Sequence, residues 1–163
     1  MFKKIFLSSI SIVVLAFLQH FVFSNLVILG ASPDILAVFI AFASVTIGQR
    51  TGTTFGFASG LIVGILSGNI GLSALIGTVE GFVAGFFHVS EESHPTLTKK
   101  RRMFYSASLT SIAIGNLLLA LMNNPMALPL YYRIPSMVVI GTLMNIFLTV
   151  LMYQLALKKT MRD

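Results

Sequence analysis

The feature that most constrains this chain is the regular spacing of its glycines within apolar sequence. Nine of the thirteen glycines recur at every fourth residue in two series, which we call the first and second glycine ladders. Positions four apart lie on one face of a helix. Inside a helix in water, each glycine is unfavourable by about 1 kcal/mol relative to alanine. The first ladder is Gly48, Gly52, Gly56, Gly60, Gly64 and Gly68, and the second is Gly77, Gly81 and Gly85.

A lipid environment explains why a chain would carry such a pattern. Small residues at four-residue spacing let helix backbones approach closely, and helices in a bilayer associate through that packing rather than through hydrophobic exclusion. From Gly52 onward, we therefore expect the ladder positions to form flat helix faces. Either a partner protein's helix packs on these faces, or the two ladders pack on each other within one chain.

The composition agrees with a membrane protein and excludes a soluble domain. Hydrophobic residues make up 56% of the 163 residues and charged residues only 10%, whereas a soluble domain carries about 25% charged residues. We expect residues 1–163 to form one transmembrane domain. The absence of cysteine excludes disulfides and thiolate metal sites. The net charge of +6 does not indicate nucleic acid, because the basic residues flank apolar segments.

Six segments are apolar enough to be membrane helices, for which about 20 residues are needed. The first begins like a secretory signal, but its apolar run exceeds the usual core of about 7–15 residues, so we expect it to be retained. Short connections at 49–51 and 67–69 predict that the second, third and fourth helices are antiparallel neighbours. The predicted helices are 5–29, 34–48, 52–67, 72–89, 103–122 and 135–157.

The distribution of basic residues predicts the orientation of these helices. Six spans leave both termini on one side, and ten of the eleven basic residues then share that side, with only Arg133 opposite. By the positive-inside rule both termini are cytoplasmic, and we reject five spans because a basic cluster would then lie outside. The run Lys99, Lys100, Arg101 and Arg102 acts either as a topology anchor or as a site for anionic lipid, at about 1 kcal/mol per residue.

Four polar residues are predicted to lie near the middle of the membrane. Counting inward from the helix ends at about 1.5 Å per residue places Gln19, His20, Glu80 and Asn145 in one layer, with Asn116 nearer the outer face. A charge at this depth is costly, so Glu80 is expected to face protein and to be either neutral or paired. The layer is either a buried hydrogen-bond cluster that fixes helix register or a site for a ligand or a proton.

The start of the second helix has a clear signal. Gly30 ends the preceding helix, and Ser32, Pro33 and Asp34 follow it. We expect Ser32 to be the N-cap, Pro33 to occupy the first turn, and Asp34 to lie near the positive end of the helix dipole.

No catalytic or metal-binding motif is present in the sequence. HExxH, Walker and GxSxG motifs are absent, and there is no arrangement of paired carboxylates. His88 and His94 lack partners at metal-ligand spacing, so we expect them to be interface and loop residues. The sequence therefore predicts no enzyme activity, no cofactor and no metal.

The order and spacing of several short motifs resemble the MreD family of rod shape-determining proteins. The resemblance covers about Ser32 to His88, and the length, the six spans and the basic C-terminus agree with it elsewhere. In one respect the chain departs from the family. Many members carry an acid in the third helix where this chain has Gly64, and Glu80 on the next helix is the candidate substitute. The motifs are 32–36 (SPDIL), 48–52 (GQRTG), 56–61 (GFASGL), 66–75 (LSGNIGLSAL) and 81–87 (GFVAGFF).

This resemblance implies a function and a set of partners. It implies a non-enzymatic scaffold of the cell-elongation complex in the bacterial cytoplasmic membrane. Such proteins associate with MreC, a RodA-type glycosyltransferase and a penicillin-binding transpeptidase, and link peptidoglycan synthesis to MreB filaments. The family is similar in fold to substrate-binding subunits of energy-coupling-factor transporters. The alternative is therefore a transporter subunit that binds a vitamin-like molecule, which mostly apolar outer loops without Trp or acids disfavour.

Overall fold

The computed structural model describes residues 2–28, 31–90, 95–124, 127 and 129–154. These residues form helices and no strand, in six successive helical segments that follow the predicted order. The last segment includes a π-helical turn at Ser136–Ile140. The elements are α1 (Phe2–Phe21), η1 (Phe23–Asn25), α2 (Ile35–Ile47), α3 (Gln49–Ser67), α4 (Ile70–Gly85), α5 (Leu97–Met122), α6 (Leu130–Pro135), η3 (Ser136–Ile140) and α7 (Gly141–Met152).

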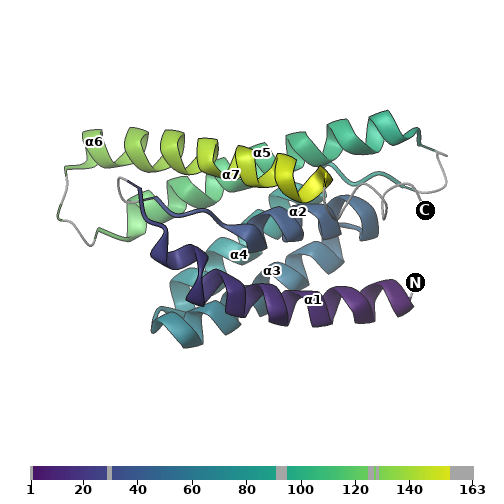
Figure 1. The fold of residues 1–163 in the computed structure, drawn as a ribbon, viewed down its shortest axis with the longest axis horizontal. Helices are drawn as coiled ribbons and strands as arrows, with labels where there is room; N and C mark the ends of the chain where they lie inside the picture. The colour runs from purple at the N-terminus through teal and green to yellow at the C-terminus, as the bar shows by residue number, and fades with distance from the viewer. Residues whose placement is uncertain (1, 29–30, 91–94, 125–126, 128, 155–163) are drawn as a thin grey trace.

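The helices form a bundle around α2. In Figure 1, the antiparallel pair α3 and α4 lies on one side of α2, and α5 and α7 lie on the other. α1 runs along α3 and also contacts α2. Both α1 and α5 begin at one end of the bundle, whereas α6 and the connection between α3 and α4 lie at the opposite end. We call the latter the connection end.

The two glycine ladders pack against each other within the chain. A Cβ atom placed on Gly56 would overlap the carbonyl of Gly77, and one on Gly77 would overlap the carbonyl of Gly56. A Cβ on Gly81 would overlap the carbonyl of Gly52, and one on Gly60 would lie 2.8 Å from the Cα of Ala74. The backbones of α3 and α4 are therefore in direct contact. No room remains on these faces for a partner's helix.

Two further ladder positions also make close approaches, but Gly68 does not. A Cβ on Gly64 would overlap the start of α4 at Ile70, and one on Gly85 would overlap Gln49. Gly68 has a φ of +77° and no atom within 4 Å of a Cβ built there. The predicted packing role is wrong for Gly68. It is the C-cap of α3, in the left-handed conformation that glycine adopts without strain.

α2 is the core helix of the bundle. Every residue from Leu36 to Val45 is buried, as expected for a helix that is apolar on all sides. Ser44 donates a hydrogen bond to the carbonyl of Gly81 over 3.1 Å, which ties α2 to α4. At the other end, Asp34 is the N-cap, and its carboxylate accepts from the N–H of Ala37 over 2.9 Å. The cap therefore lies two residues after Ser32, the predicted position.

The bounds of the first, third and fourth helices differ from the prediction. α3 begins at Gln49 rather than at residue 52, so the predicted connection at 49–51 is wrong, and Gly48 alone separates α2 from α3. α1 ends at Phe21 rather than residue 29, because polar side chains bind the carbonyls of its last turn. Ser24 donates to the carbonyl of Gln19 and Asn25 to that of Phe21, over 2.9 and 2.8 Å. α4 ends at Gly85 rather than residue 89 because the backbone beyond it turns back to α2. There, Val89 donates to the carbonyl of Val45 over 3.1 Å.

The fifth and sixth helices begin earlier than predicted. Thr96 caps α5 by accepting from the N–H of Lys99 over 3.3 Å, so the basic run 99–102 is helical. The final segment begins at Leu130 and continues through Pro135, which is accommodated by the π-helical turn η3. Residues 155–157 of the sixth predicted helix lie outside the described residues.

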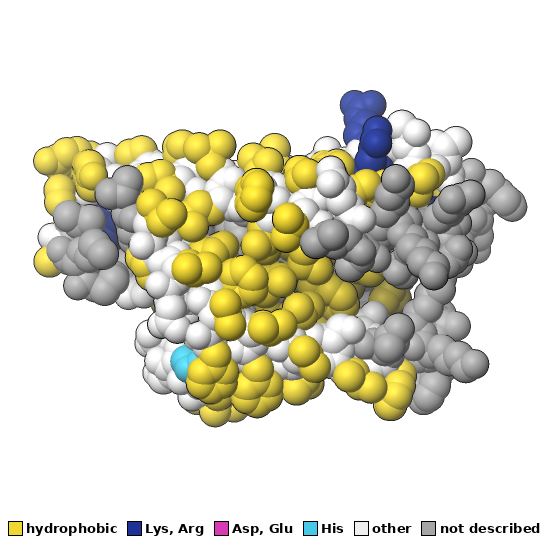
Figure 2. Space-filling view, in the orientation of Figure 1, with side chains coloured by type: hydrophobic (Ala, Val, Ile, Leu, Met, Phe, Trp, Pro, Cys, Tyr) yellow, Lys and Arg dark blue, Asp and Glu magenta, His cyan; other side chains and the backbone are white. Residues whose placement is uncertain are grey.

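The surface is apolar, whereas several polar side chains are buried. Large hydrophobic residues are exposed along α1 and α7, including Phe17, Phe21, Leu143 and Phe147. Figure 2 shows hydrophobic side chains over much of one face, with Lys and Arg near the start of α5. Soluble monomers rarely expose such large apolar patches. Three helical stretches are long and apolar enough to cross a membrane: Ser8–Asn25, Leu97–Met122 and Leu130–Met152. These features fit a membrane protein.

Alanine substitutions at glycine test the contact between α3 and α4. Gly56→Ala and Gly77→Ala place a methyl group against a backbone carbonyl of the facing helix. We expect each to destabilise the protein by about 1–3 kcal/mol, the usual range for overpacking. The measurement is the thermal unfolding midpoint of the purified protein in detergent.

Gly71→Ala is the matched control. It lies on α4 with no atom within 4 Å of the new methyl group, so the higher helix propensity of alanine, about 1 kcal/mol, should dominate. The control should unfold at or above the wild-type temperature. Equal behaviour of Gly56→Ala and Gly71→Ala would contradict the close backbone contact.

Candidate functional site

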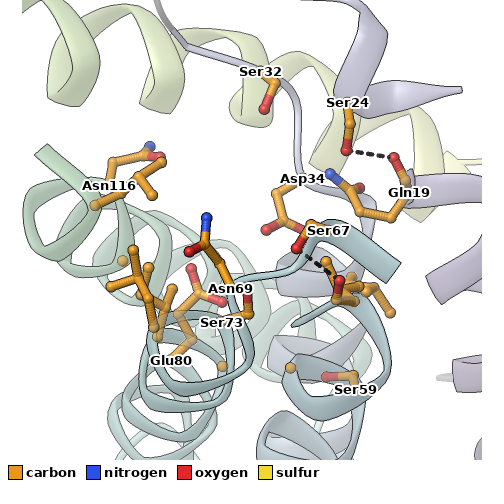
Figure 3. Close-up of a pocket in the computed structure, with 18 of the residues that line it drawn as sticks. Gln19, Ser24, Ser32, Asp34, Ser59, Ser67, Asn69, Ser73, Glu80 and Asn116 are labelled. Atoms are coloured by element: carbon orange, nitrogen blue, oxygen red, sulfur yellow. Dashed lines mark hydrogen bonds between the residues drawn. The ribbon is translucent and has the colours of Figure 1, made fainter. Parts of the chain in front are cut away.

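A polar cavity of about 290 Å³ lies inside the bundle near the connection end. Its walls come from α1, α2, α3, α4 and α5, and from the residues between α1 and α2. Figure 3 shows Asp34, Asn69, Glu80 and Asn116 around a common space. The polar residues among the described lining are Gln19, Ser24, Ser32, Asp34, Ser59, Ser67, Asn69, Ser73, Glu80, Asn116 and Asn123. The apolar ones are Leu36, Ile40, Val63, Leu72, Ile76 and Leu119.

Two buried amides hold the start of α2 at the edge of this cavity. Gln19 of α1 donates to the carbonyl of Pro33 over 3.0 Å and accepts from the N–H of Ile35 over 2.9 Å. Asn145 of α7 accepts from the N–H of Asp34 over 2.6 Å and donates to the carbonyl of Gly141. The first N–H groups of a helix have no partners within the helix. Gln19, Asn145 and the Asp34 cap supply three of them.

The predicted polar layer is therefore partly assembled. Gln19 and Asn145 meet at the start of α2, and Glu80 lies across the cavity from it. His20 does not join them, since adjacent positions on a helix point in different directions. It is half-buried, and its ring packs edge-on against Phe21 at a centroid distance of 5.0 Å.

Glu80 is the buried acid of the cavity. Its residue surface is 5% exposed, and it lines the cavity from α4. α5 passes close beside the carboxyl at Gly115, where any side chain would overlap it. Among the described residues, none donates a hydrogen bond to this carboxyl. Glu80 thus points into the cavity without a protein partner.

The sequence did not indicate that Asp34 and Asn116 line one cavity with Glu80. Asp34 lies at the start of α2, as predicted, and also contributes to the cavity wall. The amide nitrogen of Asn116 is buried and has no hydrogen-bond partner among the described residues. The pair Gly115–Asn116 in an apolar helix was the available signal, since a glycine beside an amide leaves space for a facing side chain.

The described residues contain no cluster of side chains that could hold a metal ion. No cluster of three or more His, Asp or Glu side chains occurs among them. His88 is exposed just after α4, with its Nδ1 3.0 Å from the carbonyl oxygen of Val45. His94 lies outside the described residues. What the cavity presents is two carboxyls, several amides and several hydroxyls.

Comparison with known proteins adds no assignment. No protein-family model, curated protein or solved structure matches the chain.

Replacing the two amides tests their support of α2. Gln19→Leu and Asn145→Leu keep a similar side-chain size but leave backbone N–H groups of α2 without partners. An unpaired buried donor costs about 1–3 kcal/mol, so each variant should unfold at a lower temperature than the wild type. The measurement is thermal unfolding in detergent.

Gln154→Leu provides the control. Gln154 is an exposed amide beyond the last turn of α7, and substitutions at such positions usually change stability by less than about 0.5 kcal/mol. If the Asn145 and Gln154 variants lost the same stability, the hydrogen bond from Asp34 to Asn145 would not support α2.

Proposed function

We propose that this chain is a non-enzymatic multi-pass membrane scaffold of the bacterial cell-elongation complex, similar to MreD proteins. The observation that carries the proposal is the position of the motifs that underlie the resemblance. Pro33 and Asp34 lie at the amide-supported start of the core helix. The glycine-rich motifs form the backbone contact between α3 and α4. These motifs therefore lie where helices of the bundle contact one another, and the proposal gives them a structural rather than a catalytic role.

The proposed topology has six membrane crossings with both termini in the cytoplasm. The crossings are α1, α2, α3, α4, α5 and the rod of α6, η3 and α7. Ten of the eleven basic residues then lie on the cytoplasmic side, in agreement with the positive-inside rule. The connection end, with the mouth of the cavity, faces the outside of the cytoplasmic membrane.

The lipid-exposed side chains, rather than the glycines, form the partner surfaces in this proposal. The glycine ladders are occupied within the chain, so a partner contacts the protein through its outer apolar faces. α1 and α7 carry large exposed hydrophobic residues such as Phe17 and Phe147. The proposed partners are MreC, a RodA-type glycosyltransferase and a penicillin-binding transpeptidase, with MreB filaments reached indirectly.

The basic run at the start of α5 is proposed to face anionic lipid headgroups. Lys99, Arg101 and Arg102 are exposed, and Lys100 is half-buried. Cations at a helix N-terminus oppose the helix dipole, so the run gains nothing from its own helix. An anionic membrane surface supplies the compensating charge, at about 1 kcal/mol per basic residue.

Affinity purification tests the scaffold proposal. The tagged chain is extracted from its native membranes in mild detergent, and co-eluting proteins are identified by mass spectrometry. MreC and the two peptidoglycan-synthesis enzymes should be enriched at least tenfold over an unrelated multi-pass bait. Recovery of a transport ATPase instead, with no elongation protein, would favour the transporter alternative and reject the scaffold.

A further inference from the structure

The cavity is larger and more polar than the contact between the surrounding helices requires. Its volume of about 290 Å³ is close to the lower bound, roughly 300 Å³, of sites for small molecules. One water molecule takes about 30 Å³ of liquid volume. A scaffold needs no such space, so the proposed function does not account for the cavity.

The ionisable side chains that line the cavity are all acidic among the described residues. Asp34 and Glu80 both line it, and the described lining includes no Lys, Arg or His. One oxygen of Asp34 accepts from the N–H of Ala37, and the start of α2 places a positive dipole end beside this carboxyl. Glu80 has no comparable support. An acid that is 5% exposed inside an apolar bundle needs a partner to offset its desolvation.

Asn116 on α5 also lines the cavity, and Figure 3 places it near Asn69 and Glu80. Its amide nitrogen is buried against Gly141 of α7 and does not face the open space. Buried polar groups in native proteins nearly always have partners. The Glu80 carboxyl lines the cavity without such a partner among the described residues, which indicates that a bound molecule completes its hydrogen bonds.

We propose that the cavity binds a small organic cation that carries a primary ammonium group. The ammonium lies between Asp34 and Glu80, where its three N–H donors meet carboxylate oxygens and the hydroxyl of Ser73 or the amide oxygen of Asn69. The apolar part of the ligand packs against Leu72, Ile76 and Leu119, which line the same cavity.

The volume distinguishes this ligand class from a bare metal ion. A metal ion needs several oxygen ligands at about 2.0–2.6 Å and would leave most of the cavity empty. Two nearby carboxyls disfavour an anionic ligand, and a neutral ligand leaves Glu80 without a compensating charge. The inference is independent of the scaffold proposal, because no elongation partner takes part in it.

Thermal unfolding of the purified protein with a charge-matched ligand series tests the proposal. The probes are pentylamine, pentanol and pentanoate at pH 7.5, which share a chain length and differ in charge, with MgCl₂ and CaCl₂ as metal arms. Pentylamine should raise the unfolding temperature in a saturable way. Pentanol, pentanoate and the metals should not. A saturable shift with Mg²⁺ or Ca²⁺ alone would overturn the organic-cation assignment.

Two variants show whether the shift comes from the cavity. Glu80→Gln keeps the size of the side chain and removes its charge, and Leu119→Phe fills the cavity while keeping both carboxyls. Each should weaken the apparent affinity for pentylamine at least tenfold. Leu143→Phe, the control, makes the same leucine-to-phenylalanine change at an exposed position of α7 outside the cavity lining and should retain the wild-type shift. Retention of the full shift in Glu80→Gln or Leu119→Phe, or its loss in all three variants, would overturn the proposal.

Discussion

The arrangement of this protein depends on direct backbone contact between α3 and α4. Wherever Gly56 faces Gly77 and Gly52 faces Gly81, no side chain separates the two helices. In lipid, where no hydrophobic effect drives helices together, this close packing is a main source of association. The pair forms the surface on which α2 lies, and Ser44 of α2 hydrogen-bonds to the Gly81 carbonyl at that surface. The packing of the bundle thus depends on glycine positions, where the helices have no side chains between them.

The polar interior follows from the short length of α2. Its 13 residues span about 20 Å, less than the hydrocarbon thickness of about 30 Å. Its start therefore lies within the bundle, where exposed backbone groups must be satisfied by protein. Gln19 and Asn145 meet that requirement from α1 and α7. The same shortness leaves room between α2, α4 and α5, and this room is the cavity that Asp34 and Glu80 line.

The helices were predictable because each has a strong local signal, whereas the cavity depends on tertiary contacts. Apolar runs gave the six helical segments, and glycine spacing gave the faces of α3 and α4. The early end of α1 was missed because Ser24 binds the carbonyl of Gln19, a local contact that composition does not reveal. His20 was misplaced because counting depth along a helix ignores rotation about its axis. Asn116 was not linked to Glu80 because the close approach of α5 to Glu80 at Gly115 is a tertiary contact.

The most direct test of the central claim is a measurement of the distance between α3 and α4 within one chain. The chain has no native cysteine, so spin labels can be placed at Arg50 and Phe86. Both residues are exposed and lie beside the close approach of Gly85 to Gln49. Electron paramagnetic resonance should give a short, narrow distance distribution that persists when labelled protein is diluted with unlabelled protein. A broad, long distribution, or a short distance that disappears on dilution, would show that the glycine faces do not meet within one chain.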